Sequence, residues 1–145
     1  MTVLSAESIE NYLTDYGWDY SVQKNNTWVS GWEGTVGSYP LEIELKDTIV
    51  SFVVKPLTDD ITTFDESPEL LEDILRFNHN LKLVRLSLSE SGDLCLCYDV
   101  FQENLDFDGF SSALGVLGYY CDILTKEIAE LIDFHGVESH RPTFS

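Results

Sequence analysis

The chain has 145 residues, of which 43% are hydrophobic and 23% charged, a composition typical of a single globular domain with its own core. Its 26 acidic residues outnumber 8 lysines and arginines and give a formal net charge of −18, which repels phosphate backbones and anionic membranes. These figures exclude a disordered or fibrous chain and argue against nucleic acid as a partner. No stretch approaches 18 uninterrupted apolar residues, so we expect no membrane-spanning segment.

The N-terminus and the cysteines indicate the compartment. The first ten residues lack both the basic region and the apolar run of a secretory signal. The cysteines are odd in number, and two of them lie two residues apart on an expected strand: Cys95, Cys97 and Cys121. We therefore expect reduced thiols and a cytoplasmic protein.

A short amphipathic helix is predicted near the N-terminus. Ser5 is a suitable N-cap, and Gly17 is a suitable end. Between them, apolar residues recur at spacings of three and four: Ile9, Tyr12, Leu13 and Tyr16.

From Tyr20 the period changes to two, which predicts strands. Trp28 and Trp32 fall on the same face of the first strand, with Ser30 between them. Apolar and charged residues alternate over residues 41–46, which is typical of a strand with one buried face and one solvent-exposed face. Residues 49–54 are apolar or small on both faces, so we expect a strand that is covered on both sides. Together these strands predict an antiparallel meander.

An acidic connection follows over residues 57–66. It carries four carboxylates that could form a cation-dependent switch or a hydrolytic site: Asp59, Asp60, Asp65 and Glu66. Nothing in this segment holds two carboxylates at a defined separation on a rigid element. A solvated loop is therefore the favoured interpretation, and the site is the alternative.

A second helix is predicted to begin after the Ser67 cap, with Pro68 in its first turn. Its apolar residues form one stripe: Leu70, Ile74, Phe77 and Leu81. Leu71 and Leu75 widen this stripe beyond what one contact needs, so we expect them to face a second subunit.

The remaining elements are a hairpin and a long helix. Residues 84–88 and 94–100 alternate on either side of a turn at Gly92. From Phe107 to Leu131, eight apolar residues recur at alternating spacings of three and four, which predicts one long helix. Gly115 and Gly118 interrupt it, either to let a neighbouring backbone approach a small face with Ser111 and Asp122 or to permit a kink. We expect a single domain over 1–135 and a loosely held tail over 136–145.

No metal or cofactor site is favoured. Cys95 and Cys97, with His79, His135 or His140, would make a poor zinc site because a single residue separates the thiols. Strand packing explains them better. Asp106 resembles the start of a calcium loop that lacks its twelfth-position carboxylate, so helix capping is favoured.

The two tryptophans leave an alternative open. Trp28 and Trp32 are most often core residues in such a strand, because each indole buries a large area. The alternative is a recognition surface, rimmed by Glu33, Glu42 and Glu44, that would suit an apolar or basic polypeptide.

The predicted order is helix, three strands, helix, two strands and a long helix. Residues 70–100 are the most characteristic stretch, LLEDILRFNHNLKLVRLSLSESGDLCLCYDV. This order and stretch resemble the type III secretion chaperone-like superfamily, in particular the YbjN-like proteins and their cyanobacterial relatives.

The resemblance implies a compact α+β fold with an antiparallel sheet, usually homodimeric, acidic and cytoplasmic, without catalytic residues. Secretion chaperones bind partner segments on apolar patches of the first helix and the sheet, which are here Ile9, Leu13, Trp28 and Trp32. We therefore predict a non-enzymatic, homodimeric protein-binding module, chaperone-like or a regulatory adaptor, that binds a partner polypeptide and no cofactor.

Overall fold

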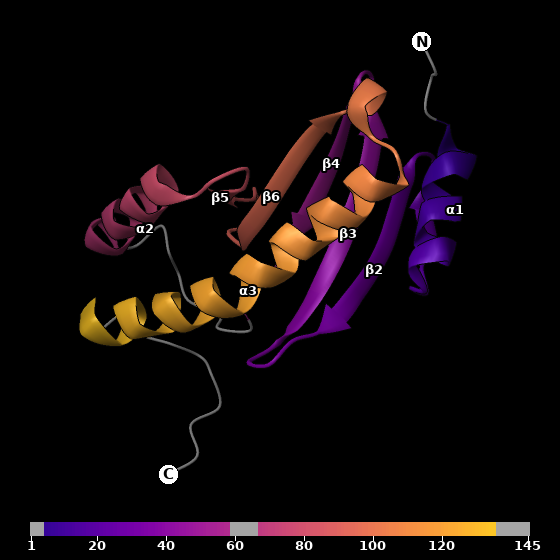
Figure 1. Cartoon of the computed structure of the whole chain (residues 1–145). Coiled ribbons are helices and arrows are strands. Elements are labelled where there is room, and N and C mark those ends of the chain that lie inside the picture. The colour runs from indigo at the N-terminus through magenta and orange to yellow at the C-terminus, as the bar shows by residue number, and fades with distance from the viewer. Residues whose placement is uncertain (1–4, 59–66, 136–145) are drawn as a thin grey trace.

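The computed structural model describes residues 5–58 and 67–135, and Figure 1 shows the arrangement of its elements. The acidic residues Asp59, Asp60, Asp65 and Glu66, His140 and the predicted tail lie outside the described residues. Within these ranges the elements are α1 (Ala6–Tyr16), β1 (Ser21–Lys24), β2 (Thr27–Glu33), β3 (Ser38–Lys46), β4 (Ile49–Val54), α2 (Pro68–Asn80), β5 (Arg85–Leu88), β6 (Leu94–Phe101), a 3-10 turn η2 (Gln102–Asn104) and α3 (Phe107–His135). None of the helices in the described ranges is long and apolar enough to cross a membrane.

The strands form one antiparallel sheet in the order β1-β2-β3-β4-β6-β5. The α+β class, the meander and the hairpin are therefore confirmed. The structure adds one strand that was not predicted, β1, which pairs with β2 through Ser21 opposite Val29. Asn26 turns the chain between them with a φ of 60°, a geometry that asparagine tolerates well. The sheet consequently ends in two short edge strands, β1 and β5.

All three described helices pack on one face of this sheet. Leu41, Ile43 and Phe52 point toward them and are at most 1% exposed. Ile9 and Leu13 of α1, with Leu70 and Ile74 of α2, belong to the same buried cluster. Figure 1 shows α3 crossing this face, with α1 toward the β2 side and α2 beyond β5. The opposite face of the sheet is left without a helix from the described ranges.

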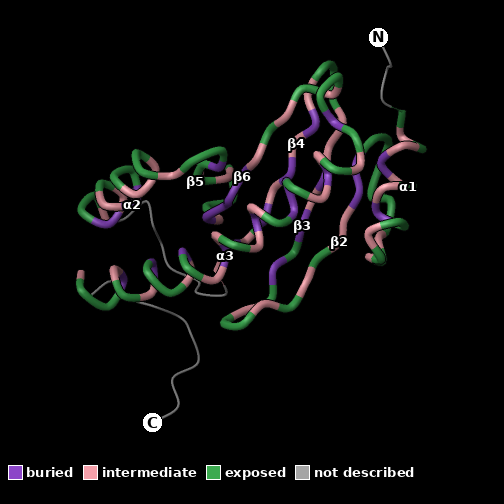
Figure 2. Tube along the Cα trace, viewed as in Figure 1, coloured by how far each residue is buried: buried purple, intermediate pink, exposed green. Residues whose placement is uncertain are grey.

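This one-sided packing corrects the prediction for residues 49–54. Val50, Phe52 and Val54 are fully buried, whereas Ile49, Ser51 and Val53 are only half-buried. Apolar or small residues on both faces of the strand predicted burial of both faces. Ser51 and Val53 are instead small residues on the open face, as the alternation of colours along the strands in Figure 2 illustrates.

Helix α3 has 29 residues, which at 1.5 Å per residue is about 43 Å. The predicted seam is buried at Phe110, Leu114, Leu117, Cys121, Leu124 and Ile128. It then continues through Ile132 in place of Leu131, because the true helical repeat is slightly longer than the predicted spacing. The α-helical assignment is unbroken through Gly115 and Gly118.

The predicted caps are present. Ser5 Oγ accepts a hydrogen bond from the Ser8 N–H at 3.2 Å, and Ser67 Oγ accepts one from the Leu70 N–H at 3.4 Å. Asp106 Oδ1 accepts a hydrogen bond from the Gly109 N–H at 2.7 Å, which is the capping role that the sequence favoured.

Candidate partner-binding surfaces

The three thiols are buried and free: Cys121 belongs to the core cluster, whereas Cys95 and Cys97 lie on the open face of the sheet. Burial raises the pKa of Cys95 to about 11 and that of Cys121 to about 12, so neither is a thiolate at neutral pH. Cys97 Sγ lies 3.3 Å from Ser87 Oγ across the β5–β6 pair. Within the described ranges, no group of three or more His, Cys, Asp or Glu side chains is placed to hold a metal ion.

Asn78, and not its neighbour His79, has the structural role at the end of α2. Its amide nitrogen donates to the Leu86 carbonyl at 2.9 Å, and its amide oxygen accepts from the Leu86 N–H at 2.6 Å. One side chain thus ties α2 to the edge strand β5. His79 is exposed in the last turn of the helix.

Three of the four residues predicted to bind a partner lie in the core. Ile9 and Leu13 are fully buried, and Trp28 is 1% exposed. Trp28 Nε1 donates to Glu10 Oε2 at 3.0 Å, so α1 satisfies the indole and covers it. The core interpretation holds for Trp28, and these three side chains do not form a surface in this conformation.

Trp32 is different because it is only partly buried, at the end of the sheet away from β5. Its ring stacks on Trp18 with centroids 5.4 Å apart and an interplanar angle of 28°. Tyr39 is paired with Trp32 across β2 and β3, and the centroids of their rings lie 5.5 Å apart. Trp32 therefore belongs to an aromatic group that joins the end of α1 to the β2–β3 hairpin.

The β2–β3 turn is held to α3 by one carboxylate. Asp122 accepts hydrogen bonds from the Thr35 N–H at 2.9 Å, the Val36 N–H at 3.1 Å and the Tyr39 hydroxyl at 2.6 Å. Burial alone would raise the pKa of Asp122, but these hydrogen bonds hold it below its ordinary value. Burial and the bonded carboxylate raise the pKa of Tyr39. Among the described residues, the predicted small face of α3 meets a neighbouring backbone at Asp122, and that backbone is the β2–β3 turn.

The open face of the sheet is hollowed over its central strands. A hollow of about 310 Å³ has a floor of small side chains, and carboxylates at one side. Its lining residues are Glu42, Glu44, Ser51, Val53, Lys55, Ser87, Ser89, Cys95 and Cys97. Glu42 and Glu44 are half-buried, and neither has an ion pair with any residue of 5–58 or 67–135. The glutamates that were predicted to rim the tryptophan face lie on this opposite face, because β2 and β3 alternate in register.

A second hollow, of about 560 Å³, lies at the β2–β3 end of the sheet. Gly31 and Pro40 are directly paired there, and Glu33 and Ser38 are the next pair along. A Cβ at Gly31 would lie 2.8 Å from the Tyr39 carbonyl oxygen, so only glycine fits. Gly31 and Pro40 leave the open face of this strand pair without large side chains, although Trp32 and Tyr39 also line the hollow, and Glu33 adds a third carboxylate beside it.

The predicted dimer residues lie at the edge formed by α2 and β5. Leu75 is 67% exposed, whereas Leu71 is half-buried and packs against the core. Leu88, on β5, is 41% exposed. We call Leu71, Leu75 and Leu88 the apolar edge.

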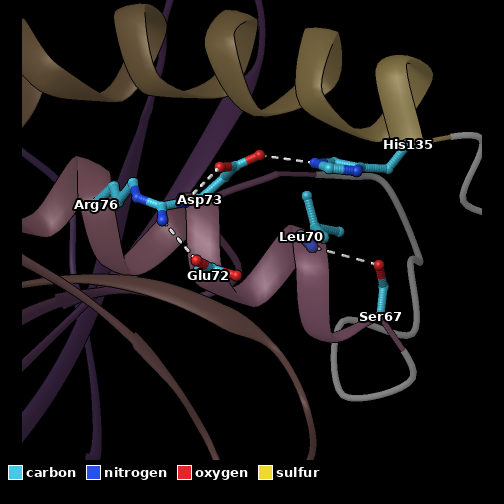
Figure 3. A network of polar contacts seen from close by, with 6 residues as sticks. All are labelled: Ser67, Leu70, Glu72, Asp73, Arg76 and His135. Carbon is cyan, nitrogen blue, oxygen red and sulfur yellow. Dashed lines mark hydrogen bonds and ion pairs between the residues drawn. The ribbon is translucent and has the colours of Figure 1, made fainter.

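At the other side of α2, a polar network fixes this helix to the end of α3 (Figure 3). His135 Nε2 lies 2.7 Å from Asp73 Oδ2, and this hydrogen bond is the main reason why the pKa of Asp73 is lowered. Arg76 pairs with Asp73 and with Glu72 on the same helix. Leu71 and Leu75 are each two positions from Asp73, which is about 200° around a helix, so they lie on the side of α2 opposite the contact with His135.

Comparison with known proteins decides the family. The family model described as "Putative bacterial sensory transduction regulator", YbjN, matches residues 5–130. The chain belongs to the YbjN family. No curated protein sequence matches it.

Solved structures show the same fold. YbjN of E. coli superposes with a TM-score of 0.61 at 14% identity, covering 94% of this chain and 97% of that one. A chain of the Yersinia pestis secretion chaperone SycH in complex with a fragment of YscM2 gives 0.53 at 14%, covering 82% and 98%. A chain of the heterodimeric ExoU–SpcU complex of Pseudomonas aeruginosa gives 0.57 at 16%, covering 81% and 95%. The predicted superfamily is therefore confirmed at the level of fold.

Proposed function

We propose that this YbjN-family protein is a non-enzymatic, homodimeric module that holds a basic segment of a partner polypeptide on the open face of its sheet. The observation that carries the proposal is the open face itself, which has two hollows, one of them beside Glu42 and Glu44, and these glutamates form no ion pair with any residue that the structure describes. Chains with this fold occur in the complex of SycH with a fragment of YscM2 and in the heterodimeric ExoU–SpcU complex.

The chemistry of this face favours a basic segment. Glu42 and Glu44 form no ion pair with a described residue, although Lys55 lines the same hollow, so a lysine or arginine of a partner gains a charged contact there without breaking an existing pair. The net charge of −18 adds long-range attraction for a cationic chain. Small floor residues such as Ser51 and Val53 leave room for a backbone to approach closely.

The apolar edge supports the dimer. Leu75 and Leu88 are large apolar side chains that are exposed where the sheet ends in the edge strand β5. Burying apolar area at roughly 25 cal/mol per Å² would supply the association energy. A twofold axis at this edge would bring Leu71, Leu75 and Leu88 of each copy against those of the other.

The dimer is tested by light scattering over a range of concentrations. We expect wild-type protein to associate and Leu75→Glu to lose that contact, since it places a charge in the interface. Asp15→Lys, an exposed change on α1, is the control. Association that Leu75→Glu leaves unaltered contradicts the dimer at this edge.

The partner site is tested by selecting a random peptide library on the immobilised protein. We expect the selected peptides to be enriched in lysine and arginine and to lose binding to a Glu42→Lys/Glu44→Lys variant. The Asp15→Lys control variant should still bind the selected peptides. Peptides without a basic consensus, or peptides that bind the double variant equally well, would exclude the open face as the site. Trp28→Ala is unsuitable here because it disrupts the core.

A further inference from the structure

The solvent side of α3 carries a regular exposed strip. Six exposed residues recur along it at spacings of three and four: Asp108, Ser112, Gly115, Tyr119, Ile123 and Lys126. Tyr119 is 65% exposed and Ile123 is 40% exposed, although both are large and apolar in character. We call these six residues the α3 strip. Figure 2 shows exposed segments recurring along α3, on the helix that crosses in front of the sheet.

The α3 strip is complementary to itself when it is reversed. Its first half is acidic and small, and its second half is large and basic. A twofold axis crossing α3 near Leu117 would place Gly115 of one copy opposite Tyr119 of the other. The same axis would place Ser112 opposite Ile123 and Asp108 opposite Lys126. Every large residue then meets a small one, and every charge meets its opposite.

The space that this pairing needs is present. A Cβ built on Gly115 or on Gly118 would meet no atom within 4 Å, so nothing in the described chain fills the region beside them. A hollow of about 440 Å³ lies there, lined by Lys82, Leu83, Ser112, Gly115, Val116, Tyr119 and Tyr120. A hollow with a glycine at its base can accept an aromatic ring from a second helix, as in knobs-into-holes packing.

Leu83 is a second unusual feature at the same hollow. Its φ is +71°, a conformation that disfavours a branched aliphatic residue, and its side chain is 71% exposed. The strained backbone thus places an apolar side chain at the rim of the hollow and not in the core. Residues held in this way cluster at contact sites.

The distribution of charge along α3 favours a second copy of this chain as the partner on this surface. No charged residue occurs from Gly109 to Cys121, in a chain that otherwise has a net charge of −18. An acidic copy can approach an acidic copy most closely over this uncharged stretch of helix, and the charged residue that lines the hollow, Lys82, is basic. The charges at the ends of the strip, Asp108 and Lys126, have opposite signs and favour the antiparallel arrangement alone.

We infer that the α3 strip is a self-association surface, on which α3 of a second copy packs antiparallel with each Tyr119 in the hollow of the other copy. This contact is separate from the apolar edge and does not depend on the proposed partner. Where both contacts form, each edge dimer presents two α3 strips, so the α3 contact links edge dimers into a larger assembly.

Charge reversal tests the pairing in a Leu75→Glu background, in which the apolar edge is disabled. Sedimentation equilibrium at low salt should give a dimer. Asp108→Lys or Lys126→Asp alone should each weaken it about tenfold, because every change occurs twice across the axis. The double variant Asp108→Lys/Lys126→Asp should restore the affinity to within about twofold of its parent. Asp15→Lys, the same change on α1, should have no comparable effect.

Two further readouts complete the test. Tyr119→Ala should abolish the dimer while leaving the melting temperature of the dilute protein unchanged, since this side chain is exposed in the monomer. A Leu75→Glu protein that is monomeric at every concentration overturns the inference, as does a dimer that is indifferent to the charge reversals. The edge dimer is judged separately, by the effect of Leu75→Glu on the otherwise wild-type chain.

Discussion

At the scale of single residues, Asp122 makes the contact that best explains how the sheet is held to α3. Its carboxylate receives three hydrogen bonds from the β2–β3 turn and from Tyr39, whose ring is 1% exposed. Gly34 is part of the same contact, because a Cβ there would lie 2.7 Å from Asp122 Oδ1. The turn is therefore shaped around the carboxylate.

Removing this carboxylate should destabilise the fold. We expect Asp122→Ala to lower the free energy of unfolding by about 1–2 kcal/mol, because hydrogen bonds to a charged acceptor are lost at a partly exposed site. Urea denaturation at neutral pH measures the change. Glu130→Ala, an exposed change on the same helix, is the control and should have little effect.

The same variant should change how stability depends on pH. Because the pKa of Asp122 is lower in the folded protein than in the unfolded chain, its contribution is present above the ordinary carboxyl pKa. That contribution is lost as the pH falls through the folded-state pKa. The gap between wild type and Asp122→Ala should therefore narrow on acidification, and a gap that persists in acid would contradict the role of the charge.

Residues with local partners could be predicted from the sequence, and those with distant partners could not. Ser5, Ser67 and Asp106 cap helices through partners three residues away, so spacing alone revealed them. Asp122 and Asn78 bond backbone groups of other elements, and no periodicity encodes such pairs. Alternation assigned Trp28 and Glu42 to faces, but could not tell which face the helices cover.

At the scale of elements, α3 keeps two glycines that cost it stability. Each is about 1 kcal/mol less favourable than alanine in a helix interior. Neither glycine is needed for close packing within the described chain, since a Cβ would meet nothing within 4 Å. Gly115 lies in the α3 strip, where association would explain it, whereas Gly118 lies beside the strip.

Gly118→Ala should therefore stabilise the dilute protein. We expect an increase of about 0.5–1 kcal/mol in the free energy of unfolding, since the helical backbone accepts alanine without strain. Chemical denaturation measures it. Gly31→Ala is the opposite case and should destabilise, because its Cβ would lie 2.8 Å from the Tyr39 carbonyl oxygen. Destabilisation by Gly118→Ala would indicate a neighbour that the described residues do not include.

The elements missed or misjudged from sequence share one cause. Strand β1 is exposed along all four residues, so it has no buried side to produce an apolar alternation. Strand β4 has apolar residues on both faces, yet one face is open. In each case exposure is set by where the helices pack, which is a property of the tertiary structure.

At the scale of the whole molecule, an excess of negative charge is compensated by few ion pairs. Within the described ranges Arg76 pairs with Glu72 and Asp73, Arg85 pairs with Asp99, and His135 is hydrogen-bonded to Asp73. The arginine pairs lie at partly exposed sites, where such pairs contribute little. Most carboxylates therefore repel one another in the compact state more than in the unfolded chain.

Screening should consequently stabilise the protein. We expect the melting temperature to rise by several degrees between about 0.01 M and about 0.2 M potassium chloride, as the Debye length falls from about 30 Å to less than 10 Å. Weakening of the exposed pairs acts in the opposite direction, but a handful of such pairs cannot offset a net charge of −18. Differential scanning calorimetry on the Leu75→Glu/Tyr119→Ala variant, which lacks both proposed contacts between copies, isolates the effect on the single chain. A melting temperature that falls over this range would mean that the ion pairs outweigh the repulsion, and that the acidic surface is not a source of instability.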